Sequence, residues 1–100
     1  MELMNLTAVI NGKKYRTETA AMLAHDCYWD GSNFERNGRN TWLLRTPRGR
    51  YFLQHQTLWQ GERDYIEPVS KEEAIRWYED LPEKEVEFEE AFPGVAVKEA

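Results

Sequence analysis

The chain has 100 residues, a formal net charge of −5 and a single cysteine, which indicates one small domain and excludes an internal disulfide. No apolar run approaches the roughly 18 residues that a membrane span needs, and the start "MELMNLTAVI" lacks the basic leader of a signal peptide. The apolar fraction of 41% and the charged fraction of 31% are typical of a soluble globular protein. We therefore expect a reduced, cytoplasmic protein in which Cys27 is a small buried side chain.

Charge is distributed unevenly along the chain. Residues 1–66 hold nine Lys and Arg against seven Asp and Glu, whereas residues 67–100 hold four against eleven. Between Arg36 and Gly61 there are five arginines and no acid. Such a charge distribution can orient a partner and speed its encounter, but it does not identify the partner.

The first quarter of the chain contains a strong hairpin signal. Asn11-Gly12 is typical of a type I′ turn, so we expect strands at about 4–10 and 13–17. The stretch "TETAAMLAHDC" then predicts a helix from about 18 to 26, because Thr17 or Thr19 can cap it and alanine, methionine and leucine favour helices. A loop follows, "YWDGSNFERNGRN".

The stretch "TWLLRTPRGRYFLQHQTLW", residues 41–59, predicts the central hairpin of the fold. Thr46-Pro47-Arg48-Gly49 has the chemistry of a tight turn, and pairing Thr46 with Arg50 sets the register. A slip of one residue would exchange the two faces of the sheet. In the predicted register Leu43 lies opposite Leu53, and Leu44 lies opposite Phe52. One face of the hairpin then carries Trp42, Leu44 and Phe52, and the other face carries Leu43, Tyr51 and Leu53. Because both faces are apolar, we expect both to be covered, at least in part.

The last third begins with a short strand at about 65–67, ended by Pro68. Ser70 and Glu73 form a capping box that predicts a helix over 71–81. Residues 83–100 form an acidic extension, for which an edge strand, a short helix and a partly ordered tail are all open. The expected fold class is therefore α+β: a single domain over residues 1–82, with a small antiparallel sheet of about four to five strands packed by two helices. The expected core residues are Ile10, Tyr15, Leu23, Leu44, Phe52, Leu53, Ile66, Ile75 and Tyr78.

The arginine-rich centre is the candidate for nucleic-acid binding, since arginine neutralises phosphates and aromatic rings stack on bases. The alternative is that the rings are core and the arginines are the solvated ends of a hairpin. A sequence pI of about 5.0 argues against a general phosphate-binding face. The candidate residues are Arg45, Arg48, Arg50 and Trp42, within a wider set that adds Arg36, Arg39, Tyr51, Phe52 and Trp59.

Catalysis and metal binding have little support in the sequence. His25, Cys27 and His55 are the only candidates for a metal site or a Cys-His nucleophile, and their spacing matches no metal-ligand motif. No glycine-rich phosphate loop opens a helix. We expect no enzyme activity, no cofactor and no metal.

The glutamates after Pro82 suggest a different function. A row of carboxylates at Glu85, Glu87, Glu89 and Glu90 can imitate a phosphate backbone, and the alternative is a solvated acidic tail that aids solubility. On the first hypothesis Phe88, Trp59 and Arg48 are additional anchors, of the kind that protein interfaces favour.

Three blocks carry a resemblance to a family of small uncharacterised proteins of bacteria, phages and plasmids. They are "KYRTETAAMLA" (14–24), "LLRTPRGRYFL" (43–53) and "IEPVSKEEAIRWYED" (66–80), which are similar to that family's Y-x-T-E-T-A, L-x-R-T-x-x-G-x-[YW]-F-L and proline–serine capped E-E-A-I-x-W blocks. The resemblance brings no established activity, cofactor or catalytic residue. Where many members have a glycine-rich loop, this chain has "QHQTLWQGERD".

Small proteins of mobile elements are often inhibitors of host defence, including anti-CRISPR and anti-restriction proteins. The resemblance therefore implies a non-enzymatic protein that binds another protein, a host nuclease or a CRISPR effector, by occluding its surface or by acidic mimicry. The alternative is a nucleic-acid-binding module that uses the arginine-rich hairpin. The oligomeric state is left open, and no membrane partner is expected.

Overall fold

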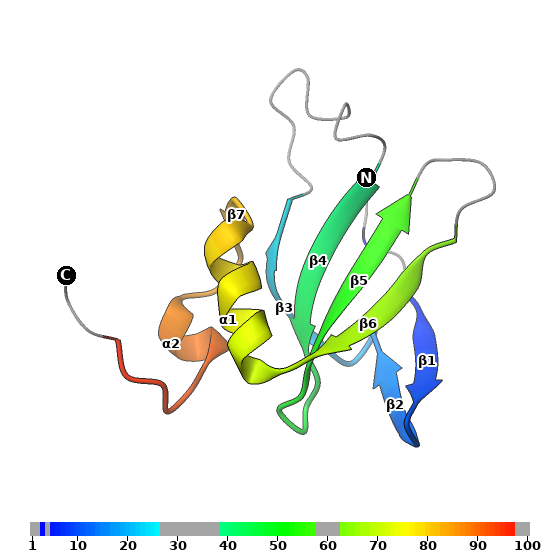
Figure 1. Cartoon of the computed structure of the whole chain (residues 1–100), viewed down its shortest axis with the longest axis horizontal. Coiled ribbons are helices and arrows are strands. Elements are labelled where there is room, and N and C mark those ends of the chain that lie inside the picture. Colours follow the sequence, from blue (N-terminus) through cyan, green and yellow to red (C-terminus); the bar gives the residue numbers. More distant parts are fainter. Residues whose placement is uncertain (1–2, 4, 27–38, 58–62, 98–100) are drawn as a thin grey trace.

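The computed structural model describes residues 3, 5–26, 39–57 and 63–97 (Figure 1). No helix in these ranges is long and apolar enough to cross a membrane. The elements in chain order are β1 (Thr7–Ile10), β2 (Lys13–Arg16), β3 (Ala21–His25), β4 (Arg39–Arg45), β5 (Tyr51–Thr57), β6 (Tyr65–Val69), α1 (Lys71–Asp80), β7 (Glu83–Lys84) and α2 (Phe88–Ala91).

Five strands form one antiparallel sheet in the order β6-β5-β4-β3-β7, and β1 and β2 form a separate hairpin. One face of the large sheet packs against α1 and α2, and the other packs against the β1–β2 hairpin (Figure 1). Each interface has its own apolar cluster. The predicted α+β single domain is therefore confirmed, with a sheet covered on both faces.

The central hairpin has the predicted register. Leu43 pairs with Leu53 and Leu44 pairs with Phe52, and Gly49 supplies the positive φ of 87° that the turn requires. Because the side chains of a strand alternate between faces, the hairpin divides as expected. Leu43, Tyr51 and Leu53 join the cluster under the helices, and Trp42, Leu44 and Phe52 join the cluster under the β1–β2 hairpin.

The helix predicted at 18–26 is wrong, because residues 21–25 form the central strand β3. This strand pairs with β4 on one side and with β7 on the other. A bulge between Met22 and Ala24 shifts the register, and both Leu23 and Ala24 are buried in the cluster under the helices. Alanine's preference for helices amounts to a few tenths of a kcal/mol per residue, whereas a strand with neighbours on both edges gains two ladders of hydrogen bonds.

The second half of the chain follows the sequence prediction more closely. Strand β6 continues through Pro68 to Val69, since a proline is tolerated on the edge strand of a sheet. The capping box of α1 is present: Glu73 N donates to Ser70 Oγ and Ser70 N donates to Glu73 Oε1, each at 3.1 Å. These hydrogen bonds from Ser70 lower the pKa of the Glu73 carboxyl.

The acidic extension is part of the same domain core. After the short strand β7 the chain turns into α2, and Ala91 and Phe92 have no exposed surface. Arg45 Nη1 donates to the carbonyls of Glu90 and Ala91 at 2.7 and 3.0 Å. Tyr51 Oη donates to the Ala91 carbonyl at 2.9 Å. Of the nine residues expected in the core, seven are buried, and Ile10 and Ile75 are half-buried.

Candidate functional site

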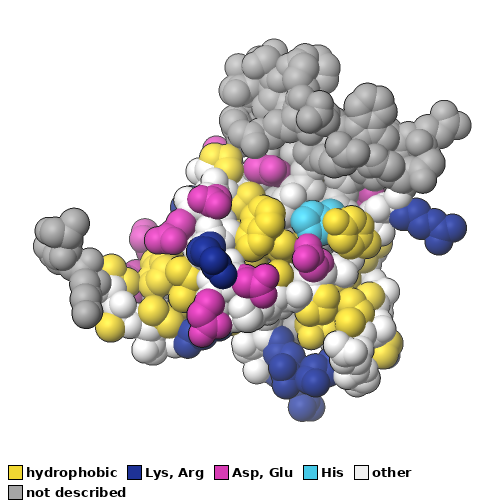
Figure 2. Space-filling view, in the orientation of Figure 1, with side chains coloured by type: hydrophobic (Ala, Val, Ile, Leu, Met, Phe, Trp, Pro, Cys, Tyr) yellow, Lys and Arg dark blue, Asp and Glu magenta, His cyan; other side chains and the backbone are white. Residues whose placement is uncertain are grey.

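The turns of the two hairpins lie next to each other and enclose a groove of about 920 Å³, here called the hairpin groove. Five exposed cations line it: Lys13, Lys14 and Arg16 from β2, and Arg48 and Arg50 from the β4–β5 turn. We call these five side chains the groove cations. Figure 2 shows a group of Lys and Arg side chains at this end of the molecule, where Figure 1 places the two turns.

The two turns are held by contacts that do not involve the groove cations' charged groups. Asn11 and Gly12 have φ of 52° and 75°, as a type I′ turn requires. In the second turn Thr46 N donates to the Arg50 carbonyl at 2.8 Å and Gly49 N donates to the Thr46 carbonyl at 2.9 Å. The charged ends of the side chains are therefore available to a ligand without loss of either turn.

The hairpin groove carries uncompensated positive charge. Among the described residues no carboxylate lines it, and none of the groove cations forms an ion pair with an acid there. Five of the thirteen lysines and arginines of an acidic protein are concentrated here. Exposed like charges gathered at one site can attract an anion.

The sequence predicted only part of this site. Arg48 and Arg50, two of the predicted nucleic-acid candidates, line the groove, but the nucleic-acid role predicted for Trp42 is wrong. Its ring is 2% exposed, packed between the sheet and the β1–β2 hairpin, where it cannot stack on a base. Arg45 also points elsewhere, because its guanidinium donates to the carbonyls at the end of α2.

Three of the groove cations were missed by the sequence analysis. The signal available was "KKYR", three cations within four residues beside the Asn11-Gly12 turn. Nothing in the sequence indicates that this turn lies beside the Pro47-Gly49 turn. The side chains of Arg36, Arg39 and Trp59, to which the sequence also assigned binding roles, lie outside the described part of the chain.

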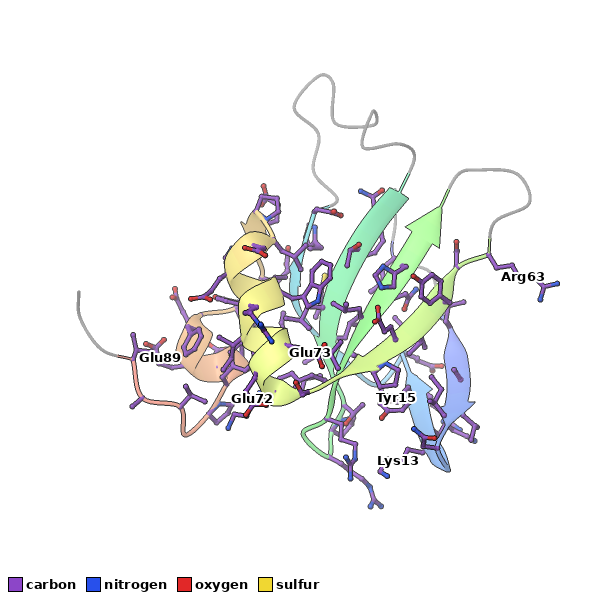
Figure 3. All side chains as sticks on the ribbon, in the orientation of Figure 1. Lys13, Tyr15, Arg63, Glu72, Glu73 and Glu89 are labelled. Atoms are coloured by element: carbon purple, nitrogen blue, oxygen red, sulfur yellow. The ribbon has the colours of Figure 1, made fainter. Side chains whose placement is uncertain are left out.

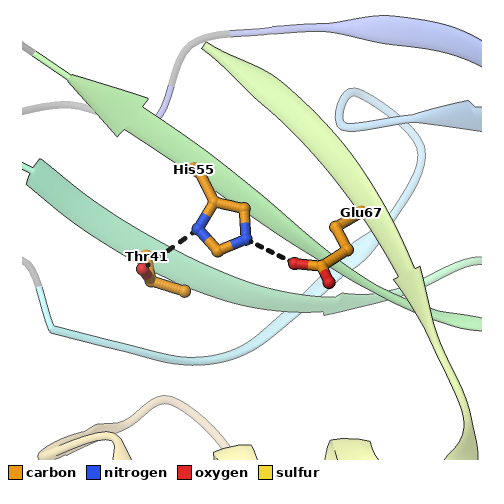
Figure 4. A network of polar contacts seen from close by, with 3 residues as sticks. All are labelled: Thr41, His55 and Glu67. Carbon is orange, nitrogen blue, oxygen red and sulfur yellow. Dashed lines mark hydrogen bonds and ion pairs between the residues drawn. The ribbon is translucent and has the colours of Figure 1, made fainter.

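The two histidines are held apart on opposite faces of the sheet. His55 Nε2 lies 2.9 Å from Glu67 Oε1 and its Nδ1 lies 3.4 Å from Thr41 Oγ1 (Figure 4). Its ring stacks on Tyr65 with centroids 4.6 Å apart and meets the edge of Trp77 at 6.4 Å.

His25 has different surroundings. Its Nε2 lies 2.7 Å from Glu85 Oε2, and its ring lies 6.3 Å from that of Trp42. The two histidines therefore do not form the joint site considered from the sequence, and Cys27 lies outside the described residues. Among the residues that are described, no three His, Cys, Asp or Glu side chains gather closely enough to hold a metal ion.

The predicted acidic residues follow β7, in α2 or just before it, and Figure 2 shows Asp and Glu side chains gathered over the two helices. Glu85, Glu87, Glu89 and Glu90 are all exposed, and Glu85 also contacts His25. Phe88 is half-buried between Tyr78 and Phe92, at centroid distances of 5.7 and 5.1 Å. Its ring is therefore largely committed to the core and is a weaker anchor than the sequence suggested.

Tyr78 is buried beside this acidic end, in the cluster under the helices. Its hydroxyl donates to the Val86 carbonyl at 2.6 Å. Burial raises the pKa of the phenol above 10.0, and the carboxylates of Glu87 and Glu89 raise it further. Both causes disfavour the phenolate, the first by desolvation and the second by repulsion between like charges.

This raised pKa predicts a loss of stability at alkaline pH. The stability that neutral Tyr78 contributes is complete below its unfolded pKa of about 10 and is lost as the pH rises through the higher folded pKa. Urea midpoints of the wild type should therefore fall more between pH 9 and pH 11.5 than those of Tyr78→Phe, which cannot ionise. Parallel curves for the two proteins would contradict the assignment.

No family model, curated protein or solved structure matches this chain, so the geometry of the described residues alone carries the functional argument.

Proposed function

We propose that this protein is a non-enzymatic binding protein that holds the phosphate backbone of a nucleic acid in the hairpin groove. The observation that carries the proposal is the groove itself, which five exposed cations from two hairpins line, with no carboxylate among the described lining residues. Lysine and arginine that neutralise phosphates release condensed counterions, which supplies sequence-independent affinity.

The charge of the rest of the molecule supports this use of the groove. The chain has a net charge of −5, so the molecule as a whole repels a polyanion at long range, and we expect the attraction to come from the groove. Glu72, Glu73 and Glu89 lie around the two helices, away from Lys13 at the hairpin turns (Figure 3). This separation orients the approaching protein with its basic end toward the ligand.

Removing one groove cation from either hairpin should weaken binding. We expect Lys14→Gln and Arg50→Gln each to lower the affinity for a labelled oligonucleotide on the order of tenfold at about 100 mM salt, since each removes one phosphate contact. Fluorescence anisotropy measures the affinity. Arg63→Gln is the matched control, because it removes the same charge from an exposed arginine far from Lys13 (Figure 3). Loss of affinity in the control, or no binding even at about 20 mM salt, would contradict the proposal.

The acidic end favours a second candidate function, inhibition of a nucleic-acid-processing enzyme by acidic mimicry. The supporting observation is that Glu87, Glu89 and Glu90 are exposed in and beside α2, and that the chain just after this helix is anchored in the core by the buried ring of Phe92. Such a surface can occupy the basic channel of a host nuclease or CRISPR effector.

The two candidate functions separate by mutation. Under mimicry, Glu89→Gln/Glu90→Gln should abolish inhibition of the enzyme while leaving the urea midpoint and the oligonucleotide affinity unchanged, and Lys14→Gln should leave inhibition intact. If Lys14→Gln abolishes inhibition and the glutamate variant does not, the hairpin groove is the functional surface and mimicry is wrong.

A further inference from the structure

The β4–β5 turn projects between two basic hollows. The hairpin groove lies on one side of it, and a second hollow of about 410 Å³ lies on the other side. Arg45, Arg48 and Lys71 line the second hollow, and no carboxylate of the described part of the chain does so. Figure 1 shows the turn extending past the end of the sheet, between the β1–β2 hairpin and α2. A ligand that fills both hollows must therefore present negative charge on both sides of a central gap.

A nucleic-acid duplex has this form, since each of its grooves is flanked by two phosphate backbones, whereas a single strand presents one. The major groove of B-form DNA is about 12 Å wide and admits a two-stranded β-ribbon. The major groove of A-form RNA is too narrow and deep for side chains to read. The arrangement of turn and hollows thus favours duplex DNA over both alternatives.

The rings beside the two hollows support the same choice. Proteins that bind single strands provide exposed aromatic rings on which the bases stack. In the hairpin groove the lining ring is Tyr15, which is 5% exposed, and in the second hollow it is Tyr51, which is 7% exposed. Both rings belong to the core and cannot stack on bases. The cations of the two hollows can contact phosphates, but neither of these lining rings can bind an unpaired base. That suits a ligand whose bases are already stacked on one another.

We infer that the partner is duplex DNA, that the β4–β5 turn enters its major groove, and that the cations on either side contact the two flanking backbones. The inference rests on the proposed function and deepens it. Arg48 lies at the tip of the turn and lines both hollows. Lys13, Lys14, Arg16 and Arg50 contact one backbone, and Lys71 contacts the other. Arg45 contributes only its charge, since its guanidinium already donates to α2 carbonyls.

The salt dependence of binding tests this geometry. The five expected phosphate contacts are those of Lys13, Lys14, Arg16, Arg50 and Lys71. With five contacts, a plot of the logarithm of the affinity for duplex DNA against the logarithm of the salt concentration should have a slope of about −4.5. The affinity should therefore fall several hundredfold between about 50 and 200 mM salt. A single strand of the same sequence and a duplex RNA should each bind at least about tenfold more weakly. Lys14→Gln and Lys71→Gln, one from each hollow, should each reduce the steepness of the slope by about one. Arg63→Gln should leave it unchanged.

The outcomes separate this inference from the proposed function. If single-stranded and duplex DNA bind equally, or if Lys71→Gln keeps the wild-type slope while Lys14→Gln loses one contact, the two-backbone geometry is wrong but the hairpin groove still binds nucleic acid. Equal affinity for duplex RNA would overturn insertion into the major groove. Failure of every nucleic acid to bind at low salt would overturn both proposals. Urea unfolding of each variant verifies that a lost contact is not a lost fold.

Discussion

Replacing Phe92 with alanine is expected to destabilise the protein by about 3 to 5 kcal/mol, as much as a substitution in the middle of the sheet. The ring has no exposed surface. It stacks on Tyr51 with centroids 5.1 Å apart and meets the edge of Tyr78 at 5.7 Å. Its centroid also lies 5.1 Å from that of Phe88, so removing the ring leaves a cavity and removes three aromatic contacts together. Since a domain of this size has about 5 to 15 kcal/mol of stability in total, a large fraction of the fold depends on this residue.

Urea unfolding followed by tryptophan fluorescence measures this effect. Phe52→Ala is the reference, because Phe52 is equally buried in the other apolar cluster. Val97→Ala is the control, because Val97 is 59% exposed and its loss should change stability by less than about 0.5 kcal/mol. A Phe92→Ala variant within about 1 kcal/mol of the wild type would show that the C-terminal segment is not part of the folded core.

The same packing explains why the role of residues 83–97 in the core was difficult to predict. The alternation of Glu85, Val86, Glu87, Phe88 and Glu89 has the period of a strand, and the density of glutamate indicates a solvated tail. The structure instead buries Ala91 and Phe92, which follow the acidic run. Two apolar residues in an acidic segment are a weak signal in the sequence. They are buried because they fill the space between α1 and the sheet, and the sequence does not show that space.

The elements that were predicted correctly are those whose structure is determined by residues close together in the sequence. The register of the central hairpin follows from the chemistry of the Pro47-Gly49 turn, and the start of α1 follows from the Ser70–Glu73 capping box. The helix predicted over 18–26 failed because the environment of β3, with β4 and β7 on either side, is set by residues distant in the sequence. Tertiary pairing there overrides the weak helix preference of alanine.

The candidate site divides in the same way. Arg48 and Arg50 are adjacent to a recognisable turn, so the sequence could nominate them. Lys13, Lys14 and Arg16 join them only because the β1–β2 hairpin packs across the face of the sheet that carries Phe52. No local sequence pattern predicts that the two hairpin turns are adjacent. The basic surface that they form together could therefore not be predicted from a chain with a pI near 5.0.

Replacing Thr17 with valine is expected to destabilise the protein by about 1 to 3 kcal/mol, although the two side chains have nearly the same shape. Thr17 is 5% exposed. Its Oγ1 accepts a hydrogen bond from Leu6 N at 3.1 Å and donates to Oε1 of Gln54, a fully buried residue of β5. Valine removes the hydroxyl from both partners, and a buried polar group that loses its partner contributes an unfavourable desolvation term.

Two further substitutions separate the hydroxyl from the methyl group of Thr17. Thr17→Ser keeps the hydroxyl and should retain most of the stability, whereas equal losses for serine and valine would show that only packing matters. In Thr17→Val/Gln54→Leu both polar partners are removed, so the loss should be smaller than the sum of the two single losses, by about 0.5 to 3 kcal/mol. Urea midpoints of the four proteins give this coupling energy.

Thr17, which the sequence suggested as a helix cap, instead ties the end of the β1–β2 hairpin to the central sheet. Three of the groove cations lie on that hairpin, so its attachment fixes their distance from Arg48 and Arg50. Thr17→Val should therefore also lower the affinity for nucleic acid, in proportion to the fraction of molecules in which the hairpin has detached from the sheet.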